Sequence, residues 1–273
     1  MIHLATLHYR SAAWIDLQLD YIERYTDEPY RVWGCLDHID RSRFARFHHA
    51  EHRGEGIAEE FDYLAGLIAA DPQTRPDDLL VFLHGDTFPI ARWAGPVREM
   101  LAREPLAGIR RDENLGEPHP HACFTATTVG LWEELGLTWM PGPEWVGTDG
   151  QAVTDLGAVL WQQLADAGVG WEPILRSNAR DLHPLWYGVY GGIVYHHGAA
   201  FRMPISRVDS APSRDDPVLL QKVRRLRIAL RSQRLSRRLY RRLIAGDEFF
   251  RELVDGPVVA AAAPREGTGA GSR

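Results

Sequence analysis

The chain of 273 residues contains two cysteines, a single lysine and no apolar run long enough to cross a membrane. Cys35 and Cys123 lie far apart in strand-like apolar segments, so we expect two buried thiols in a reducing compartment rather than a disulfide. No segment approaches the roughly 20 apolar residues that a transmembrane helix needs. The first residues lack the basic and cleavable regions of a signal peptide and predict a strand instead. These absences favour a cytoplasmic protein.

Missing motifs exclude several classes of enzyme. The sequence has no Gly-x-Gly-x-x-Gly or Walker-type loop, which argues against a dinucleotide-dependent oxidoreductase and a P-loop NTPase. It also has no Gly-x-Ser-x-Gly elbow, the nucleophile turn of the α/β-hydrolases. The apolar fraction of 45% and the charged fraction of 25% are those of an ordinary globular protein. The chain can therefore bury a core around a different kind of site.

The net charge of −6 conceals a basic segment near the end of the chain. Residues 214–245 carry eleven Lys and Arg against two Asp, but an acidic body with one basic helix is not a nucleic-acid-binding pattern. The helix expected at 219–244 could cover the core of the domain, or it could make a peripheral contact with an anionic lipid surface at the inner membrane face. We expect a main domain at 1–210, a basic helical extension at 211–256 and a disordered tail at 257–273.

The first half of the chain alternates between strand and helix patterns. Apolar segments at 2–9, 31–36 and 79–83 predict strands, and helices are expected to follow Ser11 and to begin near Ile57, with a loop between the second strand and the second helix. The segment 79–83 is apolar on both faces, as a central parallel strand is. This order predicts an α/β fold with an open, mostly parallel sheet and helices on both faces. The carboxyl ends of its strands would share one edge, where such sheets bind ligands.

The second half is less regular. Its expected elements, in order, are a helix at 93–103, strands at 106–110 and 123–129, a short helix at 131–135, a binding loop at 138–150, a helix at 155–167 capped by Thr154, and strands at 171–175 and 187–195.

An acidic residue follows the most apolar of these strands. Residues 79–89 read LLVFLHGDTFP, so the strand delivers Asp86 just beyond its carboxyl end. Gly85 allows close backbone approach, and Pro89 turns the chain away. A carboxylate in this place lies at the crevice where a divalent ion and a diphosphate would bind.

This segment resembles the strand–Asp-x-Asp element of GT-A glycosyltransferases, in the Asp-Gly-Asp-x-Phe-Pro form of some bacterial, family-2-like members. The resemblance covers roughly residues 1–205. It implies a GT-A-like fold, a nucleotide-diphosphate sugar as donor, and Mn²⁺ or Mg²⁺ held mainly by Asp86. His84 stands where the family has its first acidic residue, and an imidazole is a suitable ligand for Mn²⁺-like ions.

A histidine pair, His196 and His197, follows the last expected strand, and the resemblance implies that a late histidine completes the metal site. Either residue could do so, because neighbouring residues of a strand point to opposite faces.

The loop and helix start at 147–156 offer two candidates for a catalytic base. An inverting transferase needs a carboxylate near the acceptor hydroxyl, and both Asp149 and Asp155 suit this role. An Asp at a helix start is also stabilised by the helix dipole without any catalysis, and a retaining enzyme needs no such base.

Residues at three strand ends are expected to contact the donor. The resemblance places the nucleoside near the ends of the first two strands, and guanidinium, carboxylate and amide groups after a later strand suit phosphate and sugar hydroxyls. These candidates are Thr6, Tyr9, Arg10, Asp37, Arg110, Arg111, Asp112 and Asn114. His119 and His121 have no third ligand at zinc spacing after them, so the sequence favours a stiffened loop on the acceptor side.

The expected function is a metal-dependent transfer of a sugar to a hydroxyl of a small molecule, a glycan or a lipid-linked acceptor. One alternative is a sugar nucleotidyltransferase, although residues 7–13 lack the Gly-rich loop of that class. Another alternative, suggested by His84, is a non-catalytic nucleotide-sugar-binding protein.

Overall fold

The computed structural model describes residues 1–10, 12–148, 150–178 and 188–198. The predicted helix cap Ser11, the candidate base Asp149, the expected basic helix at 219–244 and the tail at 257–273 lie outside the described residues.

Seven strands form one mixed sheet in the order β10-β6-β7-β4-β1-β2-β3. Six of them run in the same direction and β7 runs against its neighbours β4 and β6, which confirms the expected open, mostly parallel sheet. The strands are β1 (Ile2–Tyr9), β2 (Tyr30–Asp37), β3 (His49–Glu51), β4 (Leu79–His84), β6 (Leu106–Ile109), β7 (His121–Thr128) and β10 (Glu172–Ile174).

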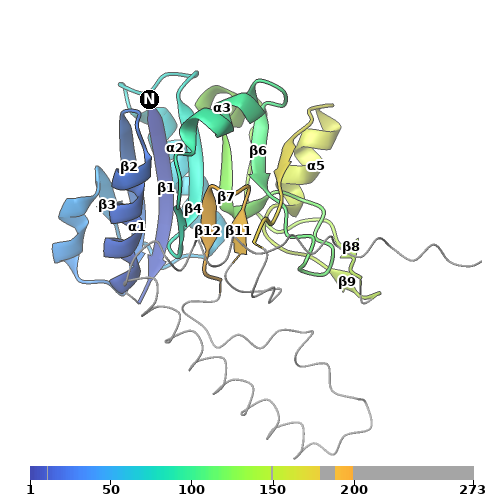
Figure 1. Ribbon diagram of the computed structural model, residues 1–273, viewed down its shortest axis with the longest axis horizontal. Helices are drawn as coiled ribbons and strands as arrows, with labels where there is room; N and C mark the ends of the chain where they lie inside the picture. The colour runs from blue at the N-terminus through green and yellow to red at the C-terminus, as the bar shows by residue number, and fades with distance from the viewer. Residues whose placement is uncertain (11, 149, 179–187, 199–273) are drawn as a thin grey trace, which may run out of the picture.

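The sheet contains a topological switch point between β1 and β4. The chain leaves β1 through α1 (Ala13–Tyr25) to β2 on one side, and it returns through α2 (Ile57–Ala70) to β4 on the other side. Successive connections in opposite directions leave a crevice at the carboxyl ends of the two central strands. These ends form the lower edge of the sheet in Figure 1.

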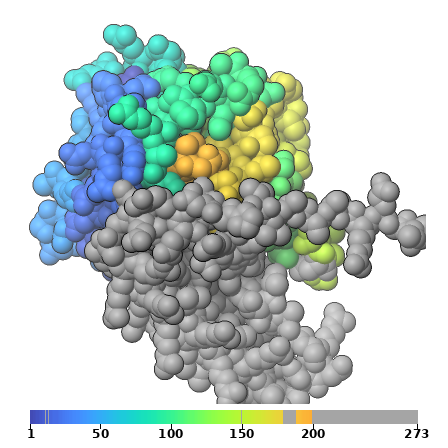
Figure 2. All heavy atoms as spheres, viewed as in Figure 1, coloured from blue at the N-terminus to red at the C-terminus, as the bar shows by residue number. Residues whose placement is uncertain are grey.

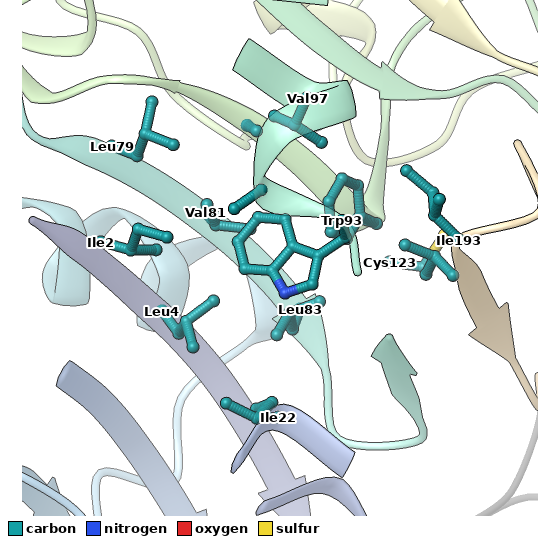
Figure 3. Packing of buried hydrophobic residues seen from close by; sticks show 14 of the residues in the cluster. Ile2, Leu4, Ile22, Leu79, Val81, Leu83, Trp93, Val97, Cys123 and Ile193 are labelled. Carbon is teal, nitrogen blue, oxygen red and sulfur yellow. The ribbon is translucent and has the colours of Figure 1, made fainter. Parts of the chain in front are cut away.

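One face of the sheet is covered by α1 and α3 (Ala94–Leu101). The indole of Trp93 lies at the centre of this layer, surrounded by aliphatic side chains from β1, β4 and α1 (Figure 3). Its Nε1 donates a hydrogen bond to Thr26 Oγ1 at 3.0 Å, so the one polar atom of this large side chain is satisfied.

The other face is covered by α2, α4 (Val129–Glu134) and α5 (Ala158–Asp166). Phe82 of β4 lies at its centre, with ring centroids 5.4 Å from Phe61, 4.6 Å from Trp132 and 5.2 Å from Trp139. Successive side chains of β4 point alternately into the two layers. Because both layers are apolar, β4 is apolar and buried on both faces.

A second sheet has the order β11-β12-β5. It brings the last described strand, β12, beside β5, which directly follows the carboxyl end of β4. Its strands are β5 (Thr87–Pro89), β11 (Gly188–Tyr190) and β12 (Val194–His196). The single strand expected at 187–195 is therefore wrong, because the segment turns back on itself to form a hairpin that pairs with β5. Figure 2 shows this segment, in orange, wedged between the green and yellow parts of the surface.

Two other expectations need correction. The loop expected between the second strand and the second helix contains a 3-10 helix at Arg41–Arg46 and the edge strand β3. In addition, α5 begins after Gly157, and Thr154 Oγ1 donates to Gly142 O at 2.9 Å instead of capping the helix.

Gly157 is the reason that the helix starts late. Its φ of +97° suits glycine alone, and a Cβ there would collide with the carbonyl oxygen of Pro120. The expected binding loop contains the short hairpin strand β8 (Trp145–Val146), which pairs with β9 (Ala152–Val153) just before this turn.

Cys35 and Cys123 are both buried and free, as expected. No helix in the described part of the chain combines the length and the apolar character that crossing a bilayer requires.

Candidate active site

Gln18 of α1 holds the turn that carries Asp86 through hydrogen bonds to its backbone. The Gln18 Nε2 donates to the carbonyl oxygens of His84 at 2.8 Å and Thr87 at 2.7 Å. Its Oε1 accepts hydrogen bonds from Thr6 Oγ1 at 3.0 Å and His8 Nε2 at 2.9 Å. Thr6, a predicted donor contact, is fully buried, and its hydroxyl supports Gln18.

Close approach of two strands explains the glycine in this turn. A Cβ on Gly85 would collide with Leu7 O and lie 2.6 Å from His8 Nδ1. The turn therefore needs glycine in order to pack against β1, which keeps the flanking His84 and Asp86 at the switch point.

His84, Asp86 and His196 come together at this point. One ligand atom from each lies within 4.8 Å of the others, and His196 Nε2 is 3.7 Å from Asp86 Oδ1. The pairing of β12 with β5 causes this contact, because it sets His196 opposite Thr87, the residue after Asp86. Two imidazoles and one carboxylate form a donor set that suits divalent transition-metal ions.

The other member of the histidine pair has a structural role. His197 is fully buried, with its ring 4.7 Å from that of Trp14 and its Nδ1 3.0 Å from Tyr195 Oη. Burial lowers its pKa to about 3. Its backbone N–H donates to Asp86 O at 3.0 Å, so it anchors β12 to the turn, whereas the ring of His196 joins the donor set.

The electrostatics of the cluster favour a neutral imidazole at His196. Burial holds its pKa well below the usual value, and the nearby His84 and Arg111 add to this effect. A neutral imidazole has a lone pair for a metal ion. The residues present therefore fit a divalent cation, with His84, Asp86 and His196 as the side chains that would hold it.

His121, expected in a stiffened loop on the acceptor side, is instead the first residue of β7. Its ring centroid lies 5.3 Å from that of His84 and 6.1 Å from that of His196. Because β7 is antiparallel, its beginning lies at the same edge as the end of β4. The strand was expected to begin two residues later, at residue 123, and the sequence did not show its direction.

A second cluster, Glu117, His121 and Asp155, also brings ligand atoms within 4.8 Å of one another. Arg111 already supplies a positive charge here: its Nε donates to Glu117 Oε2 at 2.7 Å and its Nη2 to Glu117 Oε1 at 3.1 Å. Burial alone would lower the pKa of Arg111, but the Glu117 carboxylate raises it. We assign this cluster to a buried ion pair and not to a metal, because Arg111 occupies both oxygens of Glu117.

Asp155 lies at the edge of this ion pair. Its side chain is 41% exposed, and its Oδ2 is 3.5 Å from Arg111 Nη2. Its Oδ1 accepts a hydrogen bond from Leu156 N at 2.8 Å. The carboxylate is thus oriented from two sides and still open to a ligand.

The remaining candidates of the β6–β7 loop are largely paired with one another. Arg110 Nε donates to Asp112 Oδ1 at 2.7 Å, and both side chains reach the surface. Asn114 N donates to Arg111 O at 2.8 Å, which closes a turn. Tyr190 Oη donates to Glu113 Oε1 at 2.6 Å and joins this loop to the small sheet.

Aromatic rings gather where β1 and β2 end. Tyr9 is 40% exposed, its ring lies 5.4 Å from that of His38, and the Arg10 guanidinium lies 4.7 Å above it. Asp37, expected to contact the nucleoside, is instead buried: it accepts hydrogen bonds from His52 Nδ1 at 2.6 Å and from Gly54 N at 3.0 Å. Its carboxylate holds the loop that follows β3.

The sequence matches no protein-family model and no curated protein. Several solved structures superpose on parts of this chain. Half of the chain (51%) superposes on 30% of S. aureus TarS, with a TM-score of 0.37 and 9% identity. In a separate comparison, 50% of the chain superposes on 32% of the bifunctional glycosyltransferase WbbM in its apo form, with a TM-score of 0.37 and 10% identity.

The galactosyltransferase LgtC, in complex with donor and acceptor sugar analogues, matches 63% of this chain over 73% of its own, with a TM-score of 0.38 and 11% identity. This chain spans about a third of the length of TarS and WbbM. Structural similarity with such low TM-scores does not indicate the activity of this chain.

Proposed function

We propose that this protein is a metal-dependent glycosyltransferase that moves a sugar from a nucleotide-diphosphate donor to an acceptor hydroxyl. The observation that carries the proposal is the convergence of His84, Asp86 and His196 at the switch point between β1 and β4. Open α/β sheets bind nucleotides at such points. A donor set for a divalent ion in the same place favours a diphosphate as the group bound.

Side chains where β1 and β2 end support the proposal of a donor site. Exposed aromatic rings at Tyr9 and His38 offer a surface for a base, and Arg10 beside them offers a charge for phosphate. A divalent transition-metal ion such as Mn²⁺, which this donor set suits better than Mg²⁺, would neutralise the negative charge that develops on the leaving diphosphate.

The acceptor side is assigned to the segment around β8 and β9. Asp155 is the candidate base that is described there, since its exposed carboxylate can take a proton from an acceptor hydroxyl. Arg111 and the backbone of Leu156 keep it in one orientation. Asp149 remains a prediction outside the described residues, as do the basic helix at 219–244 and its contact with a membrane or a lipid-linked acceptor.

The proposal is tested first by binding. A panel of nucleotide-sugars is added with Mn²⁺, with Mg²⁺ or with EDTA, and the shift in thermal unfolding is measured. We expect one or more donors to stabilise the wild-type protein only when the ion is present. Asp86→Asn should abolish this shift, and Asp166→Asn, a control at the exposed end of α5, should preserve it.

Transfer is tested next with Asp155→Asn. We expect donor binding to remain and turnover to fall by about 10²–10⁴-fold, the usual effect of removing a general base. Full turnover by Asp86→Asn in EDTA would refute the proposal. Tight donor binding without transfer or hydrolysis would favour a binding protein, and formation of a nucleotide-sugar from a sugar phosphate would identify a nucleotidyltransferase.

A further inference from the structure

The candidate metal donor set combines two parts of the chain that lie far apart in the sequence. His84 and Asp86 lie at the carboxyl end of β4, whereas His196 is the last residue of β12. The pairing of β12 with β5 that brings the two parts together consists of three residue pairs. Because this ladder is short, contacts from other elements can set the spacing of the ligands.

One such contact comes from Gln18 of α1, whose amide uses all of its hydrogen-bonding positions. Gln18 is fully buried, its Nε2 donates to His84 O and Thr87 O, and its Oε1 accepts two hydrogen bonds from side chains of β1. Because a backbone carbonyl can only accept, the nitrogen of this amide must face the turn, and the amide has a single orientation. Gln18 therefore holds the backbone on both sides of Asp86.

Trp14, one helical turn before Gln18, packs against the other part of the site. Trp14 is buried, and its ring lies 4.7 Å from that of His197, the residue after His196. The backbone N–H of His197 donates to Asp86 O at 3.0 Å. Residues four apart lie on the same face of a helix. One face of α1 therefore contacts both parts of the donor set.

The other faces of α1 have different contacts. The ring of Tyr21 extends the first face, 4.7 Å from that of Phe88 in β5. Ile15 and Leu19 belong instead to the apolar layer on the main sheet, and Asp16 forms an ion pair with an arginine at the surface. Contacts to the metal site and contacts to the core thus lie on separate faces and can be altered separately.

We propose that Trp14 and Gln18 are positioning residues, which hold the two parts of the metal donor set at one spacing, with α1 as their common support. Neither side chain belongs to the donor set, so both act through the residues that they contact. Removal of groups that orient metal ligands in this way typically lowers metal affinity about 10–100-fold. The ion is part of the proposed function, and the inference rests on it to that extent.

Metal affinity and stability should therefore respond to different faces of α1. Gln18→Met removes the amide and keeps a side chain of similar size, and Trp14→Leu removes the ring that packs on His197. Leu19→Ala is the matched control, because it removes a core contact from the same helix. Visible absorption measures the affinity for Co²⁺ and the positions of its bands, and urea denaturation measures the stability of each variant.

We expect Gln18→Met and Trp14→Leu each to weaken Co²⁺ binding about 10-fold or more and to shift its absorption bands. Leu19→Ala should lower the urea midpoint, because it leaves a cavity in the core, and should keep the affinity for Co²⁺ within about twofold. Unchanged Co²⁺ affinity in either of the first two variants would overturn the inference. An equal loss of affinity in Leu19→Ala would do so as well, since Co²⁺ binding would then follow stability alone.

A measurement on the wild-type protein covers variants that do not fold. If Gln18 supports the site, a bound ion must in turn stabilise the hydrogen bonds of its amide, because coupling between two sites is reciprocal. Hydrogen exchange of the Gln18 side-chain amide, followed by NMR, should slow about 5-fold or more when Zn²⁺ is added. The side-chain amide of Gln163 in α5, which donates to Gly136 O at 2.8 Å, is the internal control and should not change. Exchange at Gln18 that is the same with and without Zn²⁺ would contradict the inference.

Failure of this inference and failure of the proposed function have different signatures. Loss of Co²⁺ affinity in Gln18→Met and Trp14→Leu, in a protein whose wild type transfers no sugar, would support the inference and refute the proposed function. Sugar transfer by the wild type, with unchanged Co²⁺ affinity in the two variants, would do the reverse. A wild-type protein that binds no Co²⁺ would overturn both.

Discussion

At the scale of single residues, the structure assigns separate roles to side chains that look alike in the sequence. Three imidazoles lie near the switch point. Those of His84 and His196 belong to the candidate donor set, whereas His121 accepts a hydrogen bond from the backbone N–H of Cys123. The neighbouring His197 differs from His196 by one position and lies in the core against Trp14. Residue type alone therefore does not determine the role of each histidine here. The groups that surround each ring determine it.

Carboxylates show the same dependence on surroundings. Burial raises the pKa of Glu60 to about 8, and its hydrogen bond with Asp37 and the negative charge of Asp37 add to the shift. Burial alone would raise the pKa of Asp37 as well, but hydrogen bonds from Glu60 and from the backbone of Gly54 and Arg53 lower it. The pair therefore shares one proton at neutral pH.

This pair predicts a pH-dependent stability. The folded chain keeps the Glu60 proton up to about pH 8, whereas the unfolded chain releases it near the ordinary value of 4.5. The contribution of this group to the free energy of unfolding is therefore full at pH 4.5 and is lost as the pH rises to 8. Glu60→Gln, which mimics the protonated form, should be more stable than wild type at pH 8.5 and less different from it at pH 5.

Urea denaturation at the two pH values measures this difference. Glu59→Gln is the matched control, because the neighbouring Glu59 is exposed on the same helix turn. Comparison with wild type removes the contribution of the histidines, which also titrate in this range. An identical pH dependence in Glu60→Gln and wild type would show that Glu60 is ionised at pH 7.

At the scale of elements, the apolar pattern was sufficient to place the longer strands and the helices of the main sheet, but it missed the short edge strand β3. The segment 79–83 was expected to be a central strand because it is apolar on both faces, and β4 occupies that place. The direction of β7 and the hairpin of β11 and β12 were not predictable, because each depends on pairing with distant strands. For the first reason, His121 was assigned to an acceptor-side loop and not to the cluster with His84 and His196. For the second reason, the choice between His196 and His197 stayed open.

The start of α5 was misjudged for a local reason. Thr154 and Asp155 have the composition of a helix start, but the tight packing of Gly157 against Pro120 delays the helix. Gly157→Ala should lower the free energy of unfolding by about 1–3 kcal/mol or more, since it combines a positive φ with a collision. It should also reduce turnover, because Asp155 lies just before this turn.

Gly168→Ala is the control for backbone conformation alone. Gly168 has a φ of +66°, and nothing lies within 4 Å of the position of its Cβ. We expect a loss of about 1 kcal/mol there, the usual cost of a positive φ for alanine. Thermal or urea unfolding measures both losses. Equal losses of free energy of unfolding for Gly157→Ala and Gly168→Ala would show that the contact with Pro120 does not contribute to the effect at Gly157.

At the scale of the whole molecule, stability depends on two apolar layers that share β4. Phe82 is fully buried and contacts three other aromatic rings. Phe82→Ala should reduce the free energy of unfolding by about 3–5 kcal/mol, because it removes a large ring and leaves a cavity.

Urea unfolding followed by tryptophan fluorescence measures this loss, since Trp132 and Trp139 line the cavity. Ile57→Ala is the contrast: Ile57 is the first residue of α2, and it is 47% exposed. A change of at most about 0.5 kcal/mol is expected for it. Similar losses for the two substitutions would contradict the layer assignment.

The pairing of β12 with β5 also has a consequence for how the protein is made. Asp86 leaves the ribosome long before His196, and the two become neighbours only when the hairpin docks beside β5. The central strands can assemble earlier, but the pocket for a cation stays half-built until this late docking step. A cation held by all three residues would therefore be bound only after this docking, and a nascent chain that stalls before the hairpin emerges would lack the complete donor set.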